Sequence, residues 1–195
     1  MELTGPIIDS ITNAVRVILQ ANSGVSIGDV DILSIAAGEN HLGEIGANTI
    51  YREVTFTLDV AAYAQNDVLA DTQEIANAVR IVNGTGVIQS ISVLDQDDNG
   101  AAIDIVFLRS NVSLGAENGP ITISAANADE ILHTENIIAD DYNDYVNSQQ
   151  VNKTNISFAF QAVGTSLFVA AVYRDAAAST YTANGITLKI GILAD

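Results

Sequence analysis

The alternation of apolar and polar residues between positions 53 and 60 constrains the fold of this chain more than any other feature. The apolar positions Val54, Phe56, Leu58 and Val60 are separated by single polar residues, which is the period of a β-strand with one buried face. The same period returns near the C-terminus. We therefore expect strands at both places and at several places between them, over residues 53–60, 77–82, 87–94, 102–109, 120–125, 155–163, 166–173 and 185–193.

Polar turns separate these expected strands. Residues 83–86, 97–100 and 183–185 carry Asn, Asp and Gly, which tolerate positive φ, and the last two turns can close hairpins. Residues 127–132 predict one helical turn, and residues 134–153 predict a polar loop. Eight short strands joined by polar turns predict an all-β fold, an antiparallel β-sandwich or jelly-roll body over residues 51–195.

Residues 1–50 show a different pattern and are expected to form an N-terminal arm and a short Gly-containing stalk. Residues 6–20 suit a short amphipathic helix beginning near Pro6, or equally an extended arm. The stalk holds two apolar-Gly-acidic units, Ile27–Asp31 and Leu42–Gly46, each too small to form its own core. The alternative is a Gly-containing linker. We expect capsid docking or oligomer contacts through Ile7, Ile8, Ile11, Val15, Ile27, Val30, Leu42 and Ile45.

Composition excludes several partners. Seven Lys and Arg residues against 24 Asp and Glu residues give a net charge of −17, so a nucleic-acid backbone or an anionic membrane would be repelled. No cysteine is present for a disulfide or a thiolate zinc site. The N-terminus lacks the basic region of a signal peptide, and no apolar run reaches the ~20 residues that cross a bilayer. We expect synthesis in the cytoplasm.

The sequence offers no motif for catalysis. His41 and His133 are the only histidines, and each is more typical of a surface or interface position. Neither a nucleophile elbow, a phosphate-binding loop nor a zinc-protease motif occurs. Many carboxylates are available, but nothing selects two of them as a glycosidase pair. We therefore expect no enzyme activity and no cofactor.

Two acidic clusters remain as candidate binding sites. Asp95, Asp97 and Asn99 match the first alternate positions of a calcium loop, but Val106 stands where a bidentate Glu is required. A turn is therefore favoured over a calcium site. The second cluster, within 135–144, is interpreted as a solvated loop. Its neighbours Tyr142 and Tyr145 are candidates for contact with a partner or a sugar.

Several phrases of the sequence resemble virion structural proteins of tailed bacteriophages. In those proteins an Ile-Gly-acidic-Val stalk, as in Ile27–Asp31, and an Ala-Gly-x-Asn-x-Leu-Gly phrase, as in 37–43, precede the body. The body then opens with an Ala-Tyr-x-x-x-Asp-Val phrase, as in 62–68, and residues 80–88 are similar to a later phrase. The likeness covers about half of the chain and is lost at 110–153.

The resemblance implies a non-enzymatic protein of the virion, most simply a head decoration or cement protein. Such a protein binds the major capsid protein or another virion protein as an oligomer, expected here to be a trimer, and stabilises the head lattice. The alternative is a receptor- or carbohydrate-binding tip or fibre module. That module would use the aromatic faces of Tyr142, Tyr145, Tyr173 and Tyr181.

Overall fold

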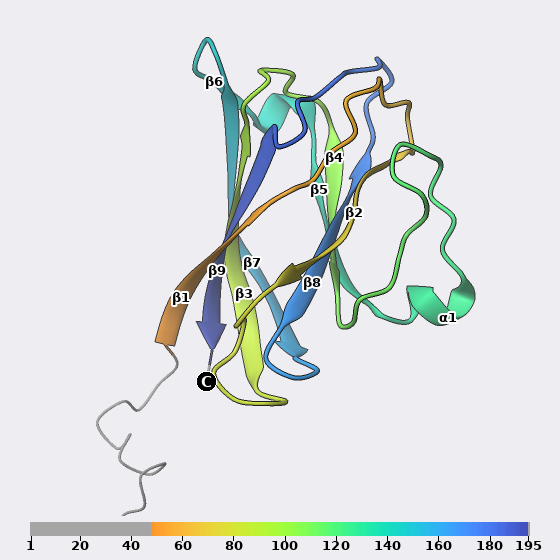
Figure 1. Cartoon of the computed structure of the whole chain (residues 1–195). Helices are drawn as coiled ribbons and strands as arrows, with labels where there is room; N and C mark the ends of the chain where they lie inside the picture. Colours follow the sequence, from red (N-terminus) through yellow and green to blue (C-terminus); the bar gives the residue numbers. More distant parts are fainter. Residues whose placement is uncertain (1–47, 195) are drawn as a thin grey trace, which may run out of the picture. The chain divides into compact units, whose positions relative to one another are not determined.

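Two antiparallel β-sheets packed face to face make up the computed structural model, which describes residues 48–194 (Figure 1). The predicted all-β antiparallel sandwich is confirmed, while its jelly-roll refinement stays a prediction. The first strand begins at Asn48, so the predicted boundary between residues 50 and 51 falls inside that strand.

One sheet has five strands and the other has four. The five-stranded sheet has the order β1 (Asn48–Thr55), β9 (Ile186–Ala194), β3 (Thr85–Asp95), β7 (Gln149–Gln161) and β6 (Asn143–Asp144). The four-stranded sheet has the order β2 (Val68–Ile75), β8 (Leu167–Tyr173), β4 (Ile103–Leu108) and β5 (Ile131–Ile137). Two short helices complete the described part, α1 (Ala125–Ala128) and the 3-10 helix η6 (Ala139–Asp141).

The core lies between the sheets and is built from the inward positions of the alternating strands. On β9, Leu188, Ile190 and Ile192 are fully buried while Lys189 is exposed. Strand β4 is buried along its whole length because both of its faces are covered. Its inward residues, such as Phe107, join the main core, and Val106 and Leu108 belong to a second apolar cluster.

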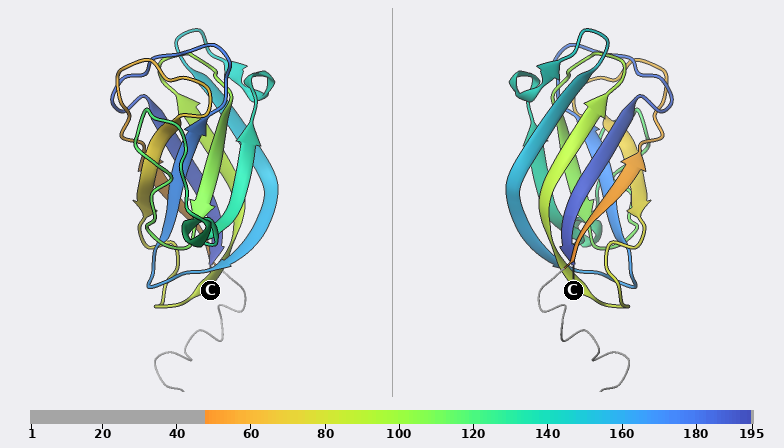
Figure 2. Two further views of the ribbon diagram at one scale, coloured as in Figure 1. Left: turned by 90° about the vertical axis from the view of Figure 1, so that its right-hand side faces the viewer. Right: turned by 90° about the vertical axis from the view of Figure 1, so that its left-hand side faces the viewer.

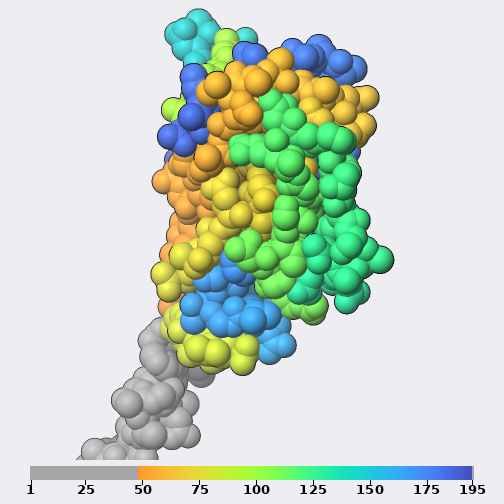
Figure 3. All heavy atoms as spheres, turned by 45° about the vertical axis from the view of Figure 1, so that its right-hand side comes forward, coloured from red at the N-terminus to blue at the C-terminus, as the bar shows by residue number. Residues whose placement is uncertain are grey.

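Segment 109–124 covers the outer face of the four-stranded sheet and creates this second cluster (Figures 2 and 3). Leu114 is fully buried there, with Ile121 and Ile123 packed beside it. The segment is tied to β2 by backbone hydrogen bonds in both directions. The Val68 N–H donates to the Gly119 carbonyl at 2.8 Å, and the Asn118 N–H donates to the Val68 carbonyl at 2.9 Å.

The outer face of the five-stranded sheet is different, because none of the described segments crosses it (right view of Figure 2). Its outward side chains are therefore open to whatever surrounds the sandwich. The two sheets thus differ in exposure: the outer face of the four-stranded sheet is covered by apolar side chains of segment 109–124, and no described segment covers the outer face of the five-stranded sheet.

Four expected strands agree with the structure to within one or two residues, namely 87–94, 102–109, 166–173 and 185–193. The expected strand 53–60 ends early, because β1 stops at Thr55. Phe56 and Leu58 nevertheless stay buried, and their N–H groups donate to carbonyls at the start of β9 and just before it. Val60 is exposed, contrary to the alternation. Strand β7 begins at Gln149, six residues before the expected start.

Two expected strands are wrong. Residues 77–82 form the connection between β2 and β3, where Asn77 and Asn83 both have positive φ. Residues 120–125 alternate in burial but lie outside every strand, since they pack on the sheet surface and lead into α1. Strand β2, which the sequence did not predict, opens with Val68, Leu69 and Ala70, which are all buried and show no alternation.

The expectations for 127–132 and 134–153 are also corrected. The helical turn ends at Ala128. Ile131 already begins β5, which pairs with β4 in antiparallel fashion. The expected polar loop contains the end of β5, helix η6, strand β6 and the first residues of β7. The turns at 97–100 and 183–185 do not close hairpins. Each carries the chain from one sheet to the other.

Candidate functional site

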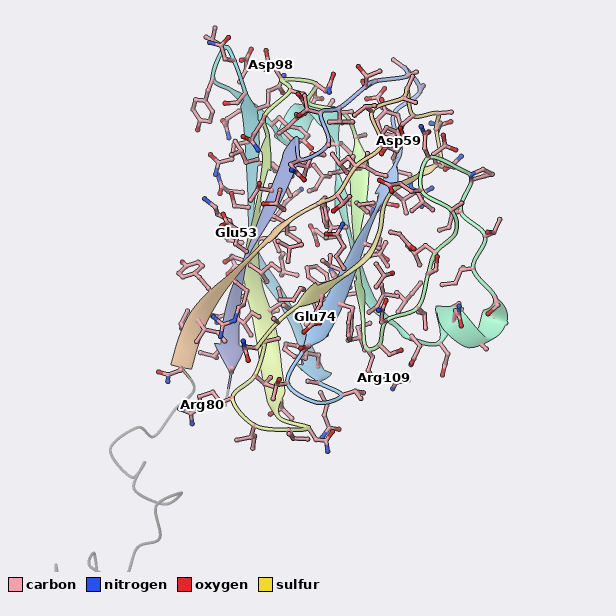
Figure 4. All side chains as sticks on the ribbon, viewed as in Figure 1. Glu53, Asp59, Glu74, Arg80, Asp98 and Arg109 are labelled. Carbon is pink, nitrogen blue, oxygen red and sulfur yellow. The ribbon has the colours of Figure 1, made fainter. Side chains whose placement is uncertain are left out.

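The sandwich has two chemically different ends. The first, called here the Asn48 end, holds Asn48 and its register partner Ala194 together with the loops 76–84 and 162–166. The second, called here the acidic end, holds the loops 56–67, 96–102, 138–148 and 174–185. Figure 4 marks the two ends with Arg80 and with Asp59 and Asp98, respectively.

The Asn48 end exposes apolar side chains. Ile81 is 62%, Val82 68% and Val163 58% exposed. Their two loops are joined by hydrogen bonds, among them the Asn83 N–H to the Gly164 carbonyl at 2.8 Å. These loops contain Arg80 and no carboxylate. Three large apolar residues exposed in adjoining loops are typical of a surface that binds another protein.

The acidic end carries carboxylates that are at least partly exposed. Its loops contain one cation, Arg174, whose guanidinium donates to Asp104 at 2.5 Å. Helix η6 is held there by Asp141, which accepts the Ile138 N–H and pairs with Lys153 at 2.8 Å. These two contacts hold the pKa of the Asp141 carboxyl below its usual range. The exposed or half-buried carboxylates of this end are Asp59, Asp97, Asp98, Asp140, Asp141, Asp144 and Asp175.

The candidate calcium ligands Asp95 and Asp97 instead accept hydrogen bonds that hold loops in place. The buried Asp95 carboxylate accepts N–H groups from Asp97 at 2.9 Å, Asn99 at 3.0 Å and Gly100 at 2.8 Å. Burial raises the pKa of the Asp95 carboxyl, and the three donors act against that rise. Asp97 accepts the Thr182 N–H at 2.8 Å, which ties loop 96–102 to loop 174–185. Residues 48–194 contain no group of three or more His, Cys, Asp or Glu side chains that could hold a metal.

The four tyrosines expected to contact a ligand have different environments. Tyr173 and Tyr181 are buried and pack around Tyr63, with ring centroids 6.1 and 6.0 Å from it, so the expectation for these two is wrong. Tyr142 is partly buried against the core, where burial, and then the charges of Asp95 and Asp141, raise its pKa. Tyr145 is exposed near the tip of the β6–β7 hairpin.

The remaining sequence candidates are a histidine and the N-terminal contact residues. His133 lies on β5, stacked on Phe158 with ring centroids 4.6 Å apart, and its Nε2 is 3.2 Å from Glu135. It is a structural side chain on the sheet. His41 and the predicted contact residues Ile7, Ile8, Ile11, Val15, Ile27, Val30, Leu42 and Ile45 lie outside the described residues.

The sequence analysis missed a groove on the open face of the five-stranded sheet. It has a volume of about 280 Å³, and we call it the sheet-face groove. Its lining comes from four strands whose polar positions fall into register, which no local pattern reveals. The residues are Tyr51 of β1, Ser90, Ile91 and Ser92 of β3, Asn152 and Thr154 of β7, and Lys189 and Gly191 of β9.

Comparison with known proteins gives distant likenesses. No family model and no curated protein matches the chain. Similar solved structures include the K3 adhesin domain of Lys-gingipain from Porphyromonas gingivalis, 16% identical over 68% of this chain and 71% of that chain, with a TM-score of 0.29. A pentameric capsid protein from metagenomic phage sequences is 17% identical over 100% of this chain and 93% of that chain, with a TM-score of 0.26.

The structure of maize chlorotic mottle virus is also similar, at 12% identity over 77% of this chain and 94% of that chain, with a TM-score of 0.26. At TM-scores this low, none of the three likenesses carries an argument about what the chain does. Within the described part of the chain, neither helix has the length and apolarity to span a bilayer.

Proposed function

We propose that this chain is a non-enzymatic structural protein of a phage virion, a decoration or cement protein that binds the assembled head as an oligomer and stabilises it. The observation that carries the proposal is the polarity of the sandwich. At the Asn48 end, exposed apolar side chains lie in two joined loops that hold no carboxylate, whereas at the opposite end they lie in loops that also carry carboxylates. A protein added to a preformed lattice needs one adhesive end and one that resists further association.

The two ends fit these tasks physically. Burial of Ile81, Val82 and Val163 against a partner removes apolar surface from water, which favours association at about 25 cal/mol per Å². The carboxylates of the acidic end repel the same end of other copies and keep the outward surface soluble. The phrases in residues 27–43 that resemble phage stalks precede Asn48 in the chain, and we propose that residues 1–47 hold the oligomer, a trimer.

The strand order supports the same proposal. With the short β6 set aside, the remaining strands form the orders β1-β9-β3-β7 and β2-β8-β4-β5. Along the chain, consecutive strands of these eight lie in different sheets. The exception is the pair β4 and β5, which lie side by side in the four-stranded sheet. We infer a jelly roll from this order. Jelly rolls recur in viral capsid and lectin domains, although a fold alone does not determine a function.

A receptor-binding tip is the second candidate, and one observation favours it. Val146 at the tip of the β6–β7 hairpin is 77% exposed and has a φ of 81°. A β-branched residue rarely adopts this conformation, and residues held in such conformations collect at functional sites. Binding of the full chain to host cells, lost in Tyr145→Ser and retained in Ile81→Ser, would favour the tip.

The proposed function is tested on phage particles that are produced from the genome encoding this chain and then purified. Mass spectrometry of the purified particles is expected to find the chain in a fixed ratio to the major capsid protein. The double variant Ile81→Ser, Val163→Ser is expected to lower that ratio, while Val146→Ser, a matched exposed apolar site at the acidic end, leaves it unchanged. Particles that lack the wild-type chain would refute the proposal.

A further inference from the structure

We propose that the sheet-face groove binds a neutral saccharide unit. This inference goes beyond the proposed virion role and does not depend on it. The groove lies on the open face of the five-stranded sheet, which no described segment covers (Figure 2). Glu53 on β1, labelled in Figure 4, marks one edge of this face.

Register places the lining residues in two rows across four strands. Tyr51 pairs with Gly191, which pairs in turn with Ser90, and Ser90 pairs with Thr154. The second row runs from Glu53 through Lys189 and Ser92 to Asn152. Side chains at such positions share one face of the sheet, so the rows form a single continuous surface.

Irregular pairing bends the sheet at this surface. Both ladders of β3 shift register between Ile88 and Ser90. On β7 the shift is accompanied by positive φ at Asn155 and Ser157. Bulges of this kind bend a strand, increase its twist and are frequent beside binding sites. The bend gives the open face a hollow where a flat sheet would have none.

Gly191 deepens this hollow. A Cβ at position 191 would lie 2.6 Å from the Ser90 hydroxyl oxygen and 3.6 Å from Cε1 of Tyr51. Glycine therefore leaves an opening between an aromatic ring and a hydroxyl group. The Tyr51 side chain is 74% exposed beside this opening, so its ring face is accessible to a ligand.

The polar groups of the groove are the kind that bind sugar hydroxyls. Among residues 48–194, the side chains of Ser90, Asn152 and Thr154 form no hydrogen bond with protein atoms. Ser92 is oriented by Gln150, whose Nε2 donates to its hydroxyl oxygen at 2.7 Å and leaves the hydroxyl proton to donate. A ring for stacking beside hydroxyl and amide groups matches a pyranose, which has apolar C–H faces and polar edges.

Charge and size select a neutral and small ligand group. Lys189 is the groove's single cation, and its Nζ lies 3.6 Å from a carboxylate oxygen of Glu53, which offsets its charge. The net charge of −17 further disfavours phosphorylated or acidic ligands. A volume of about 280 Å³ is near the lower end of small-molecule sites, which span roughly 300–1,000 Å³.

The test is binding of the full chain to maltohexaose, cellohexaose, laminarihexaose, mannohexaose and chitohexaose, with trigalacturonate as the acidic probe. Saturation-transfer NMR reports binding, and tyrosine fluorescence reports the site, because the chain has no tryptophan. At least one neutral hexasaccharide is expected to bind at about 1 mM or below, in preference to trigalacturonate. The affinities for the corresponding monosaccharides show which form of the sugar is recognised. Equal affinities for monosaccharide and hexasaccharide indicate a free sugar, and tighter binding of the hexasaccharide indicates a unit within a longer chain.

Variants locate the site. Tyr51→Ala is expected to weaken binding about tenfold, and Asn152→Ala with Thr154→Ala about as much, while Val60→Ala, at an exposed site outside the groove, leaves it unchanged. Asn152 and Thr154 are exposed, so their replacement leaves folding intact. The proposal is overturned if no neutral sugar binds at about 1 mM, or if the groove variants bind as tightly as Val60→Ala.

Discussion

Asp95 shows how a residue type that indicates metal binding can serve a structural purpose instead. A carboxylate followed by polar residues at alternate positions is the pattern of a calcium loop, and also of a turn in which the carboxylate caps backbone N–H groups. In this chain three N–H groups of the same loop point at the Asp95 carboxylate. The energetic role of Asp95 is therefore to hold loop 96–102 in place.

Replacement of Asp95 tests that role. Asp95→Ala leaves three N–H groups without their acceptor, so we expect the free energy of unfolding to fall by about 3 kcal/mol in urea denaturation. Asp98→Asn is the matched control. It removes a charge from the same loop at a position of positive φ that Asn tolerates, and should change stability by less than about 0.5 kcal/mol. Equal effects of the two variants would contradict the assignment.

Asp175 predicts a specific dependence of stability on pH. Its carboxylate accepts the Ala177 N–H at 3.0 Å and the Ala102 N–H at 3.3 Å, and these contacts lower its pKa. A carboxyl whose pKa is lower in the folded state stabilises the fold above its unfolded-state pKa, 3.8, and loses this contribution as the pH falls through its folded-state pKa.

We therefore expect Asp175→Asn to be destabilised by up to about 1 kcal/mol at pH 7 and by less at pH 3, which lies below the unfolded-state pKa of 3.8, so that part of the contribution is already lost. Urea denaturation at both pH values measures the difference. Asp140→Asn, at an exposed carboxylate of the same end, serves as the control and should show no comparable change. A deficit for Asp175→Asn that grows at pH 3 would show that the sign is wrong.

Among the strands, β9 was predictable from its alternation and β2 was not. The sequence predicts β9 because Leu188 and Ile190 alternate with Lys189. It does not predict β2, because segment 109–124 covers the outer side of Val68 and turns its alternation into an apolar run. A segment that covers a strand but lies far from it in the sequence leaves no trace in the strand's own pattern of apolar and polar residues.

The groove and the core tyrosines were missed for the same physical reason. Lys189 and Gly191 appear in the sequence as the polar half of one strand, but their neighbours Ser92 and Thr154 come from strands paired at long range. Likewise, Tyr181 lies in a polar stretch of sequence yet is buried by Tyr63, more than a hundred residues earlier. Which polar positions meet is decided by register, and register is not encoded locally.

The cover over the four-stranded sheet yields a prediction of its own. Leu114 is fully buried in the second apolar cluster, so Leu114→Ala is expected to lower the free energy of unfolding by about 3 kcal/mol. Hydrogen exchange should accelerate at the Val68 amide, which the cover protects through Gly119. Val112→Ala, at a half-buried site in the same segment, should have less effect. A loss below about 1 kcal/mol for Leu114→Ala would mean that the segment is not packed as described.

Considered as one body, the sandwich has an end that exposes Ile81, Val82 and Val163, an acidic end and an open sheet face. Within the part of the chain that the structure describes, the main core is continuous from Val54 to Ala194, and we expect residues 48–194 to fold without the preceding residues. The proposed oligomer then depends on residues 1–47. This division would separate the stability of the sandwich from the assembly of the proposed oligomer, and it can be measured on purified protein.

The most direct measurement is the molar mass by light scattering, at several concentrations, of the full chain and of a chain that begins at Asn48 after an initiator methionine. Starting at Asn48 keeps β1 intact. We predict a full-length mass of three times the 20.4 kDa of one chain, a monomeric shortened chain, and equal unfolding midpoints for the two. A full-length monomer at every concentration, or a shortened chain that remains a trimer, would contradict the claim that residues 1–47 hold the oligomer.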